Sequence, residues 1–258
     1  MIDSNFRPKI YLINLDKSKD RLDSCFDRLN KQNITFQRIS AVLGDGLTEQ
    51  KKSRYYSQKL NEEKYHYQLT NGEIGCYLSH RKAWEKIANS DDPYAVVLED
   101  DIKLIGDFNL AITAMNNLPF DWQIIKLSSY KDRKRKVAFC VNADNGFKLA
   151  VHKKPMTGCA ATAITRGAAI KLLEHSEVFG RPVDVDIQHF WEKNIYVHSL
   201  LPYPISQDMS YQSTICNRKV RQEVYFRFWR RKRQQFNSYF LNKAAVKSHV
   251  LELKNMNL

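Results

Sequence analysis

The sequence predicts an α/β fold in which a mainly parallel sheet is flanked by helices. Strand-like runs alternate with helical patterns, beginning with KIYLINL at residues 9–15 and a helix over residues 21–32. The run YAVVL at residues 94–98 is continuously apolar, which is typical of a central strand covered on both faces. The chain has 258 residues, of which 43% are hydrophobic, so it is long enough to bury the core of such a fold.

The remaining elements follow in order along the chain. A second strand is expected near residues 35–42, before two glycines at 44 and 46. Residues 70–88 give the clearest helix, because Thr70 and Glu73 have the spacing of a capping box. Further strands are predicted at 122–127, 148–152, 159–165 and 194–201, with a helix at 166–175. We expect residues 182–186 to be extended and to lead into a short helix through Trp191.

Charge is concentrated near the carboxyl terminus. The formal net charge is +13, and the segment from Arg218 to Arg233 alone holds eight basic residues and one acid. Such a local excess indicates a docking surface. Residues 1–215 are therefore predicted to form the main domain, and residues 216–258 a basic, aromatic tail that is helical to about Val250.

The five cysteines are widely spaced and none lies in a C-x-x-C pair. We expect neither a disulfide framework nor a structural zinc site, and the thiols suit a reduced, cytoplasmic setting. No run approaches the ~20 apolar residues that a membrane-spanning helix needs. The protein is expected to be soluble or peripheral.

Three consecutive acids, Glu99, Asp100 and Asp101, follow the buried strand. In open α/β sheets, ligands bind at the carboxyl ends of the strands. Carboxylate oxygens suit Mg²⁺ or Mn²⁺, which also hold phosphate oxygens. Glu99 and Asp101 would lie on one side of an extended chain and could flank one ion. The alternative is a solvated turn after the strand.

A resemblance to a known family rests on five ordered segments: INLDKSKDR at 13–21, NGEIGCYLSHRKAW at 71–84, VLEDDI at 97–102, ATAITRGAAIKLL at 161–173 and PVDVDIQHFW at 182–191. Together they resemble glycosyltransferase family 25, which includes lipopolysaccharide and lipooligosaccharide biosynthesis enzymes and collagen galactosyltransferases. The resemblance implies a GT-A-like, Rossmann-type mixed sheet for residues 1–215. It also implies a nucleoside diphosphate sugar donor, commonly UDP-galactose, and inversion at the anomeric carbon. The acidic signature of the family corresponds to residues 99–101.

Several residues are predicted to contact the donor. Asn14 and Arg21 lie where the first strand gives way to its helix, a position that suits contact with the nucleotide and that the resemblance supports. Ala41 and Gly44, after the second strand, would leave room for the base or ribose. Asp100, between the two metal candidates, is placed in the donor site as well. For Arg21 alone, a surface ion pair is the alternative.

The helix at residues 70–88 supplies three more candidates. Glu73 has a structural alternative as part of the helix cap, and the two roles are compatible. Ser79 and His80 lie on the same helix, and the resemblance places His80 in the donor site, although a lone helical histidine is usually structural. His189 or His198 could complete the metal shell.

Inverting transfer needs a base that takes the proton of the acceptor hydroxyl. Asp184 and Asp186 are the candidates, because they alternate with valines and both carboxylates would project to the same side of an extended segment. One would be the base and the other an acceptor clamp or a helix cap. The pattern does not decide which.

The tail at residues 218–233 interleaves basic with aromatic residues, which is typical of an interfacial helix on an anionic membrane. A lipid-linked oligosaccharide acceptor would make that location useful. Nucleic-acid binding and a helix packed on the domain with a solvated basic face are the alternatives.

The predicted protein is a bacterial-type, metal-dependent, inverting glycosyltransferase. It would use Mn²⁺ or Mg²⁺ to move a hexose, galactose from UDP-galactose, onto a lipooligosaccharide-type acceptor. Its location would be cytoplasmic and peripheral, on the inner face of the cytoplasmic membrane. A basic nucleic-acid-binding protein without catalysis and another metal-dependent nucleotidyltransferase are the alternatives.

Overall fold

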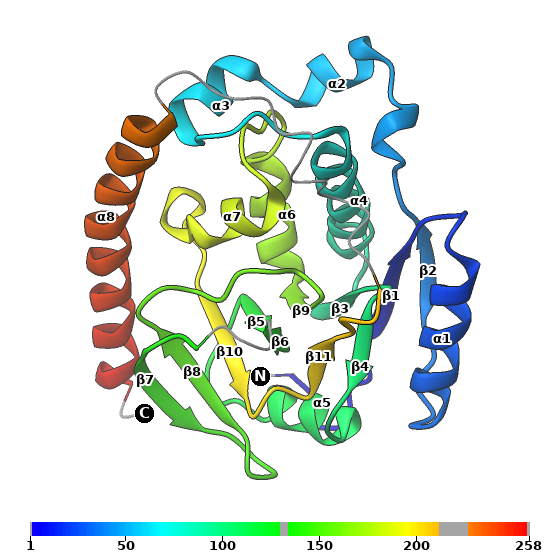
Figure 1. Ribbon diagram of the computed structural model, residues 1–258. Helices are drawn as coiled ribbons and strands as arrows, with labels where there is room; N and C mark the ends of the chain where they lie inside the picture. The colour runs from blue at the N-terminus through cyan, green and yellow to red at the C-terminus, as the bar shows by residue number, and fades with distance from the viewer. Residues whose placement is uncertain (1, 130–133, 212–226, 257–258) are drawn as a thin grey trace.

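The computed structural model describes residues 2–129, 134–211 and 227–256. Its helices and short 3-10 turns (η) cover both faces of a central sheet (Figure 1). They are α1 (Lys19–Asn30), η1 (Gly44–Gly46), α2 (Glu49–Tyr55), α3 (Gln58–Lys64), α4 (Asn71–Ala88), α5 (Phe108–Asn116), α6 (Arg166–Glu174), α7 (Val183–Gln188), η2 (Phe190–Lys193) and α8 (Arg227–Asn255).

Eight strands of the described chain form the main sheet, in the order β2-β1-β3-β9-β5-β10-β8-β7. These are β1 (Lys9–Asn14), β2 (Gln37–Ser40), β3 (Tyr94–Glu99), β5 (Ile124–Lys126), β7 (Val137–Asn142), β8 (Lys148–His152), β9 (Ala161–Thr165) and β10 (Val197–Leu201). Only β8 and β9 run against the direction of the other strands in this sheet. The predicted α/β class, with a mixed and mostly parallel sheet flanked by helices, is confirmed.

A small second sheet lies beside the carboxyl end of β3. It consists of β4 (Ile102–Leu104), β11 (Ile205–Gln207) and β6 (Ser128–Ser129), in the order β4-β11-β6. The sequence analysis did not predict it, because strands of two or three residues leave too short a pattern to read. It matters because β11 lies next to the chain that leaves β3.

The alternation of β3 assigns each of its residues to one of two buried layers. Ala95 and Val97 pack with residues of α4, α6, α7 and α8, whereas Val96 and Leu98 pack with residues of α1 and α5. Continuing the same alternation, Glu99 should face α4 and the next residue should face α1. The continuous apolar run in the sequence therefore predicted the burial of β3 on both faces correctly.

Helix α4 is held at its start by the predicted capping box, which is confirmed. The Thr70 side chain accepts from the Glu73 backbone amide at 3.2 Å, and the Glu73 carboxylate accepts from the Thr70 amide at 2.9 Å. The helix also packs tightly against the chain that follows β2. A side chain on Gly75 would come within 2.5 Å of the Val42 carbonyl oxygen, so only glycine permits this contact.

Two expectations about local structure are wrong. Residues 183–186 are helical, in α7, rather than extended, so side chains two residues apart do not share a side. Helices α2, α3 and α5 were not predicted. Of the tail predicted to be helical from Arg218, the residues up to 226 lie outside the described part of the chain.

Helix α8 packs along the sheet edge opposite β2 and α1 (Figure 1). Val246 and Leu253 are buried in the same layer as α4 and α6. His249 is stacked on Tyr196, with ring centres 3.7 Å apart. Within the described residues, none of the helices has the length and apolar character needed to cross a membrane.

Candidate active site

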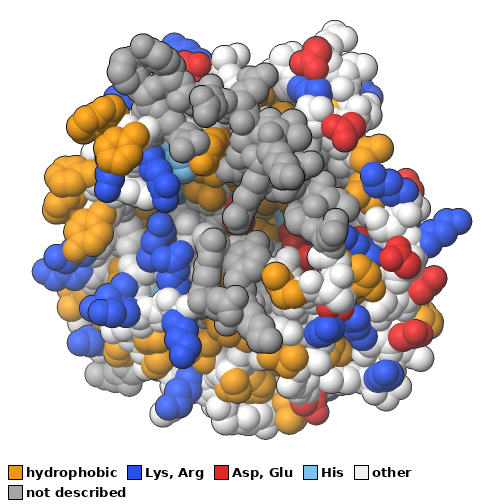
Figure 2. All heavy atoms as spheres, in the orientation of Figure 1, with side chains coloured by type: hydrophobic (Ala, Val, Ile, Leu, Met, Phe, Trp, Pro, Cys, Tyr) orange, Lys and Arg blue, Asp and Glu red, His pale blue; other side chains and the backbone are white. Residues whose placement is uncertain are grey.

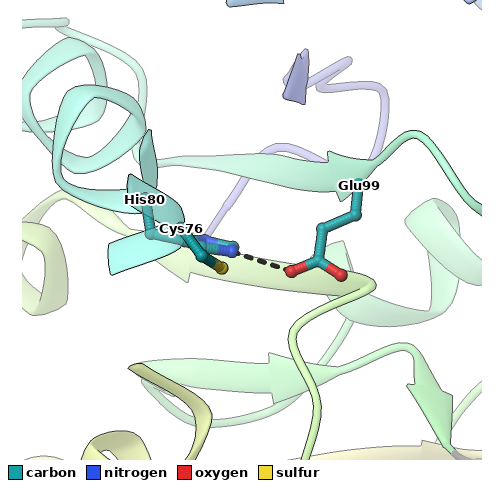
Figure 3. Close-up of side chains that lie close together, drawn as sticks. All are labelled: Cys76, His80 and Glu99. Carbon is teal, nitrogen blue, oxygen red and sulfur yellow. Dashed lines mark hydrogen bonds and ion pairs between the residues drawn. The ribbon is translucent and has the colours of Figure 1, made fainter. Parts of the chain in front are cut away.

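The acidic triplet lies at the carboxyl end of β3, and its three side chains face three different elements. Glu99 faces α4, where His80 Nε2 lies 3.0 Å from Glu99 Oε1 (Figure 3). His80 is buried, with 2% of its surface exposed, whereas 21% of the Glu99 side chain is exposed. The strand alternation that buries β3 therefore also directs Glu99 toward the helix predicted to carry donor-site residues.

Asp100 faces the opposite layer, as the alternation requires. One of its oxygens accepts from Asn14 Nδ2 at 2.8 Å, and the other accepts from Arg21 Nη1 at 3.2 Å. The predicted donor-site residues Asn14 and Arg21 thus meet at Asp100, between β1 and α1. Arg21 also lies over the ring of Tyr211, with its guanidinium carbon 4.9 Å from the ring centre.

Asp101 faces the small sheet. Its Oδ2 accepts from Gln207 Nε2 at 2.7 Å. In the described part of the chain, its other oxygen, Oδ1, is buried and has no hydrogen-bond partner. Burial and the negative charge of Glu99 raise the pKa of the Asp101 carboxyl to about 7.

These residues fit a divalent cation. The orphaned Asp101 oxygen and the neighbouring like charges are destabilising in the free protein, and a cation would relieve both. Carboxylate oxygens are the ligands that Mg²⁺ and Mn²⁺ prefer. The metal role of Glu99 and Asp101 stays a prediction.

The two candidate bases have different surroundings. Asp186 is buried and accepts from Tyr77 Oη at 2.7 Å. It also forms ion pairs with Arg181 at 3.3 Å and Lys193 at 3.1 Å. The predicted projection of Asp184 and Asp186 to one side is wrong, because residues two apart on a helix point in nearly opposite directions.

Asp184 is half-buried, and backbone amides rather than side chains contact its carboxylate. It accepts from the Val185 amide at 2.8 Å and from the Gly158 amide. Burial raises the pKa of the Asp184 carboxyl, and the positive charge of Lys126 opposes that shift. Of the two acids, Asp184 is the more exposed residue.

Lys126 is a residue that the sequence analysis missed. It ends β5 and is 1% exposed, although lysine is rarely buried without a charged partner. Its Nζ donates to the Gly158 carbonyl at 2.7 Å and lies 3.6 Å from Cys159 Sγ. The available signal was a lysine that closes an apolar run at a strand end, on the edge where ligands bind.

The other predicted donor-site residues join α4 to the chain after β2. Ser79 Oγ accepts from the Val42 amide at 2.8 Å and donates to the Gly75 carbonyl at 2.7 Å. A side chain at Gly44 would meet the Asn71 carbonyl oxygen at 1.8 Å, so glycine permits the close approach of the start of α4. The expected contact of Gly44 with the base or ribose stays a prediction. Ala41 is half-buried and lies just before this junction. Its contact with the base or ribose stays a prediction.

The two histidines expected to complete a metal shell lie elsewhere. His198 Nε2 is 2.8 Å from His249 Nε2, in a buried pair between β10 and α8. His189 uses both ring nitrogens, with the Val185 carbonyl at 2.9 Å and Ser238 Oγ at 3.0 Å. The histidine that lies beside the acidic triplet is His80.

Comparison with known proteins identifies the family. The sequence profile described as "Glycosyltransferase family 25 (LPS biosynthesis protein)" matches residues 7–187. The chain belongs to glycosyltransferase family 25. The match includes β1, the acidic triplet, Lys126 and both aspartates of α7, and it ends before Lys193, Gln207 and Tyr211.

Relatives in this family carry names that fit the same class of enzyme. The chain is 28% identical to a putative glycosyltransferase of Haemophilus influenzae, over 69% of this chain and 60% of that protein. It is 30% identical to mouse procollagen galactosyltransferase 2, over 49% of this chain and 21% of that protein. It is 31% identical to the lipooligosaccharide biosynthesis protein lic2B of H. influenzae, over 38% of this chain and 34% of that protein.

Solved structures resemble this family 25 chain only distantly. A197 from STIV matches with a TM-score of 0.38 and 13% identity, over 75% of this chain and 81% of that one. A mutant Drosophila beta-1,4-galactosyltransferase 7, in complex with manganese, UDP-Gal and xylobiose, matches with a TM-score of 0.39 and 8% identity, over 86% and 77%. These likenesses are too weak to carry an argument about the fold or the ligands.

Proposed function

We propose that this family 25 chain is a GT-A-like, metal-dependent, inverting glycosyltransferase that moves galactose from UDP-galactose onto a lipooligosaccharide-type glycan. The observation that supports this most directly is the Asp101 carboxylate, which is buried beside two other acids and has one oxygen without a hydrogen-bond partner among the described residues. Retaining such a group costs folding free energy, so a ligand that uses it explains its presence. The names of the relatives favour a galactosyl donor and a lipooligosaccharide acceptor.

In this proposal Glu99 and Asp101 hold a divalent cation, Mn²⁺ or Mg²⁺. Such a cation supplies neutralisation of the negative charge that develops on the departing diphosphate. Asp100 keeps the strand end in place through its hydrogen bonds to Asn14 and Arg21. Asn14 is 1% exposed and acts through Asp100, whereas the partly exposed Arg21 side chain borders the nucleotide. Ser79 fixes the chain after β2, which borders the same site.

Asp184 is the proposed base. It takes the proton of the acceptor hydroxyl while that oxygen attacks the sugar carbon from the side opposite the leaving group. Asp186 is unsuited to this role because Tyr77, Arg181 and Lys193 already surround its carboxylate. Lys126 stabilises the ionised form of Asp184 that a base requires.

The substitution Asp101→Asn tests the function. We expect Mn²⁺-dependent UDP release from UDP-galactose to fall by about a thousandfold, because one metal ligand is lost. The melting temperature should stay equal or rise, since a buried like charge is removed. Asp92→Asn is the matched control: Asp92 precedes the opposite end of β3 and pairs there with Lys9. Undiminished activity in Asp101→Asn, or UDP release that does not depend on a metal, would contradict the proposal.

We further propose that the acceptor is lipid-linked and that the enzyme binds the anionic, cytoplasmic face of the membrane. Residues 218–226 of the predicted membrane segment lie outside the described residues, but the outer face of α8 supports the idea. Trp229, Phe236 and Phe240 are 68%, 65% and 52% exposed and lie at helical spacing on one side. Lys243 and Lys247 continue that side and are exposed.

Figure 2 shows apolar and basic side chains gathered along the side of the molecule that α8 occupies in Figure 1. Within Arg227–Asn255 there are eight Lys or Arg residues and one acid, Glu252. Aromatic residues enter the headgroup boundary, and each basic residue near an anionic surface contributes about 1 kcal/mol. The combination fits a membrane surface better than a water-facing helix.

Vesicle flotation tests the membrane proposal. Replacing Lys232, Lys243 and Lys247 by Glu should reduce partitioning onto phosphatidylglycerol vesicles by about a hundredfold or more. Replacing Lys17, Lys19 and Lys31 by Glu changes the net charge equally but near α1, away from α8, and should have little effect. Equal flotation of both triple variants would show that net charge alone drives binding.

A further inference from the structure

A cysteine, a histidine and a carboxylate converge beside the acidic triplet. Cys76 Sγ, a ring nitrogen of His80 and a carboxylate oxygen of Glu99 all lie within 4.8 Å of one another (Figure 3). Cys76 and His80 are four residues apart on α4, so they occupy the same face of the helix. The strand alternation of β3 brings Glu99 to that face.

The separations suit a bound transition metal. A tetrahedral ion with bonds of about 2.0–2.3 Å holds its ligand atoms roughly 3.5 Å apart. The His80–Glu99 separation is 3.0 Å and the largest separation in the group is at most 4.8 Å. These separations lie close to the spacing that such an ion requires.

The kind of ligand atom indicates the class of ion. Magnesium prefers oxygen ligands, whereas thiolate and imidazole favour zinc, cobalt and similar borderline ions. Burial and the charge of Glu99 raise the pKa of the Cys76 thiol well above its usual range, so the free protein holds a neutral thiol there. An ion bound by the three residues would displace that proton into solvent.

We propose that Cys76 and His80 bind, together with Glu99, a thiolate-accepting divalent ion of the zinc and cobalt class. The inference rests on the proposed metal role of Glu99 and changes the expected ligand set from carboxylates alone to a mixed sulfur, nitrogen and oxygen set. The ion preference that follows is zinc and cobalt over manganese, and manganese over magnesium.

Cobalt titration tests the ligand set without any activity measurement. Co²⁺ added to the full chain should produce a near-ultraviolet absorption band from thiolate-to-cobalt charge transfer and visible bands of a four-coordinate ion. Cys76→Ser should abolish the charge-transfer band. Cys159→Ser and Cys140→Ser are the matched controls and should keep it. A band that is absent, or that survives Cys76→Ser, would overturn the proposal.

A second variant keeps the test decisive if Cys76→Ser fails to fold. His80→Asn should retain the thiolate band but weaken Co²⁺ binding by more than about a hundredfold, since loss of even an outer-shell partner costs about 10- to 100-fold. Unchanged Co²⁺ affinity in that variant removes His80 from the ligand set and contradicts the inference.

The outcome is separable from that of the proposed function. Mn²⁺-dependent UDP release that persists in Cys76→Ser, in the absence of a cobalt–thiolate band in the wild type, would leave the glycosyltransferase proposal standing and remove this one. A cobalt–thiolate band in a protein that binds no nucleotide sugar would support the metal site and contradict the glycosyltransferase proposal.

Discussion

The acidic strand end at residues 99–101 and the ion-pair cluster around Asp186 differ in what faces their carboxylates. Asp186 is surrounded by Tyr77, Arg181 and Lys193, each within 3.3 Å. At the strand end, by contrast, Asp101 keeps one buried oxygen without a partner in the described chain. Both carboxylates are buried, so burial alone does not distinguish the two regions.

The pKa shifts in the two regions have opposite signs. Burial and Glu99 raise the pKa of Asp101 to about 7. Burial would also raise the pKa of Glu192, a member of the Asp186 cluster, but hydrogen bonds and positive charge from Arg181 lower it to about 2. A carboxylate satisfied by the protein stabilises the fold, whereas one left unsatisfied is available to a ligand. The comparison therefore separates acids whose carboxylates are neutralised within the protein from acids that we propose to bind a ligand.

The largest expected effect separates the two aspartates of α7. Asp184→Asn should lower galactosyl transfer by about a thousandfold, within the range for loss of a general base, with the melting temperature little changed. UDP-galactose binding, measured by calorimetry, should be kept because the base acts on the acceptor. Full transfer activity in this variant would remove Asp184 from the mechanism.

The next effect is on stability. Asp186→Ala leaves Arg181 and Lys193 buried without their shared partner, and removal of one side of a buried ion pair costs about 3–5 kcal/mol. Urea unfolding should show this loss. The informative comparison is Asp184→Ala, which should cost far less. Similar losses for both would contradict the distinction between the two regions.

The sequence predicted the position of the acidic triplet but not which of the two aspartates of α7 is accessible. The triplet followed from the burial of residues 94–98, a pattern that is local and survives folding. The partners of Asp186 are Tyr77, Arg181 and Lys193. No local sequence pattern shows that these side chains meet at Asp186. Expecting residues 182–186 to be extended made the two acids look equivalent, whereas α7 directs them apart.

Lys126 and the Cys76–His80 pair show a second limit of prediction from the sequence. A lysine at the end of an apolar run is compatible with a solvated strand terminus. The burial of Lys126 and its contacts with Gly158 and Cys159 depend on a chain segment more than 30 residues away, which no local pattern shows. The spacing of Cys76 and His80 was visible on a correctly predicted helix. Its significance depends on Glu99, whose approach to α4 follows from the pairing of β3 with its neighbours.

A smaller effect is expected for substitutions of Lys126, whose positive charge lowers the pKa of Asp184. Lys126→Met removes the charge that lowers the pKa of Asp184, so that pKa should rise. The acidic limb of the pH profile of kcat/KM should move to higher pH, so activity should fall on that limb and be kept at pH values above it. Lys126→Arg keeps the charge and should keep the limb nearer the wild-type position. A uniform loss at every pH would indicate a purely structural role.

The smallest effect concerns the pH dependence of stability at Glu192. The pKa of this carboxyl is lowered from 4.5 to about 2 in the folded protein, so its ionised form stabilises the fold above the unfolded value. That stabilisation should be lost as pH falls from about 4.5 toward 2, because the unfolded chain takes up the proton first. Glu192→Gln should therefore flatten the decline of the urea midpoint across this window. Glu49→Gln, which removes an exposed partner of Lys52, should leave the decline unchanged. An equally steep decline in the wild type and in Glu192→Gln would mean that Arg181 does not hold this carboxylate ionised. The carboxylates around Asp186 would then not all be neutralised by the protein, which contradicts the contrast with the acidic strand end.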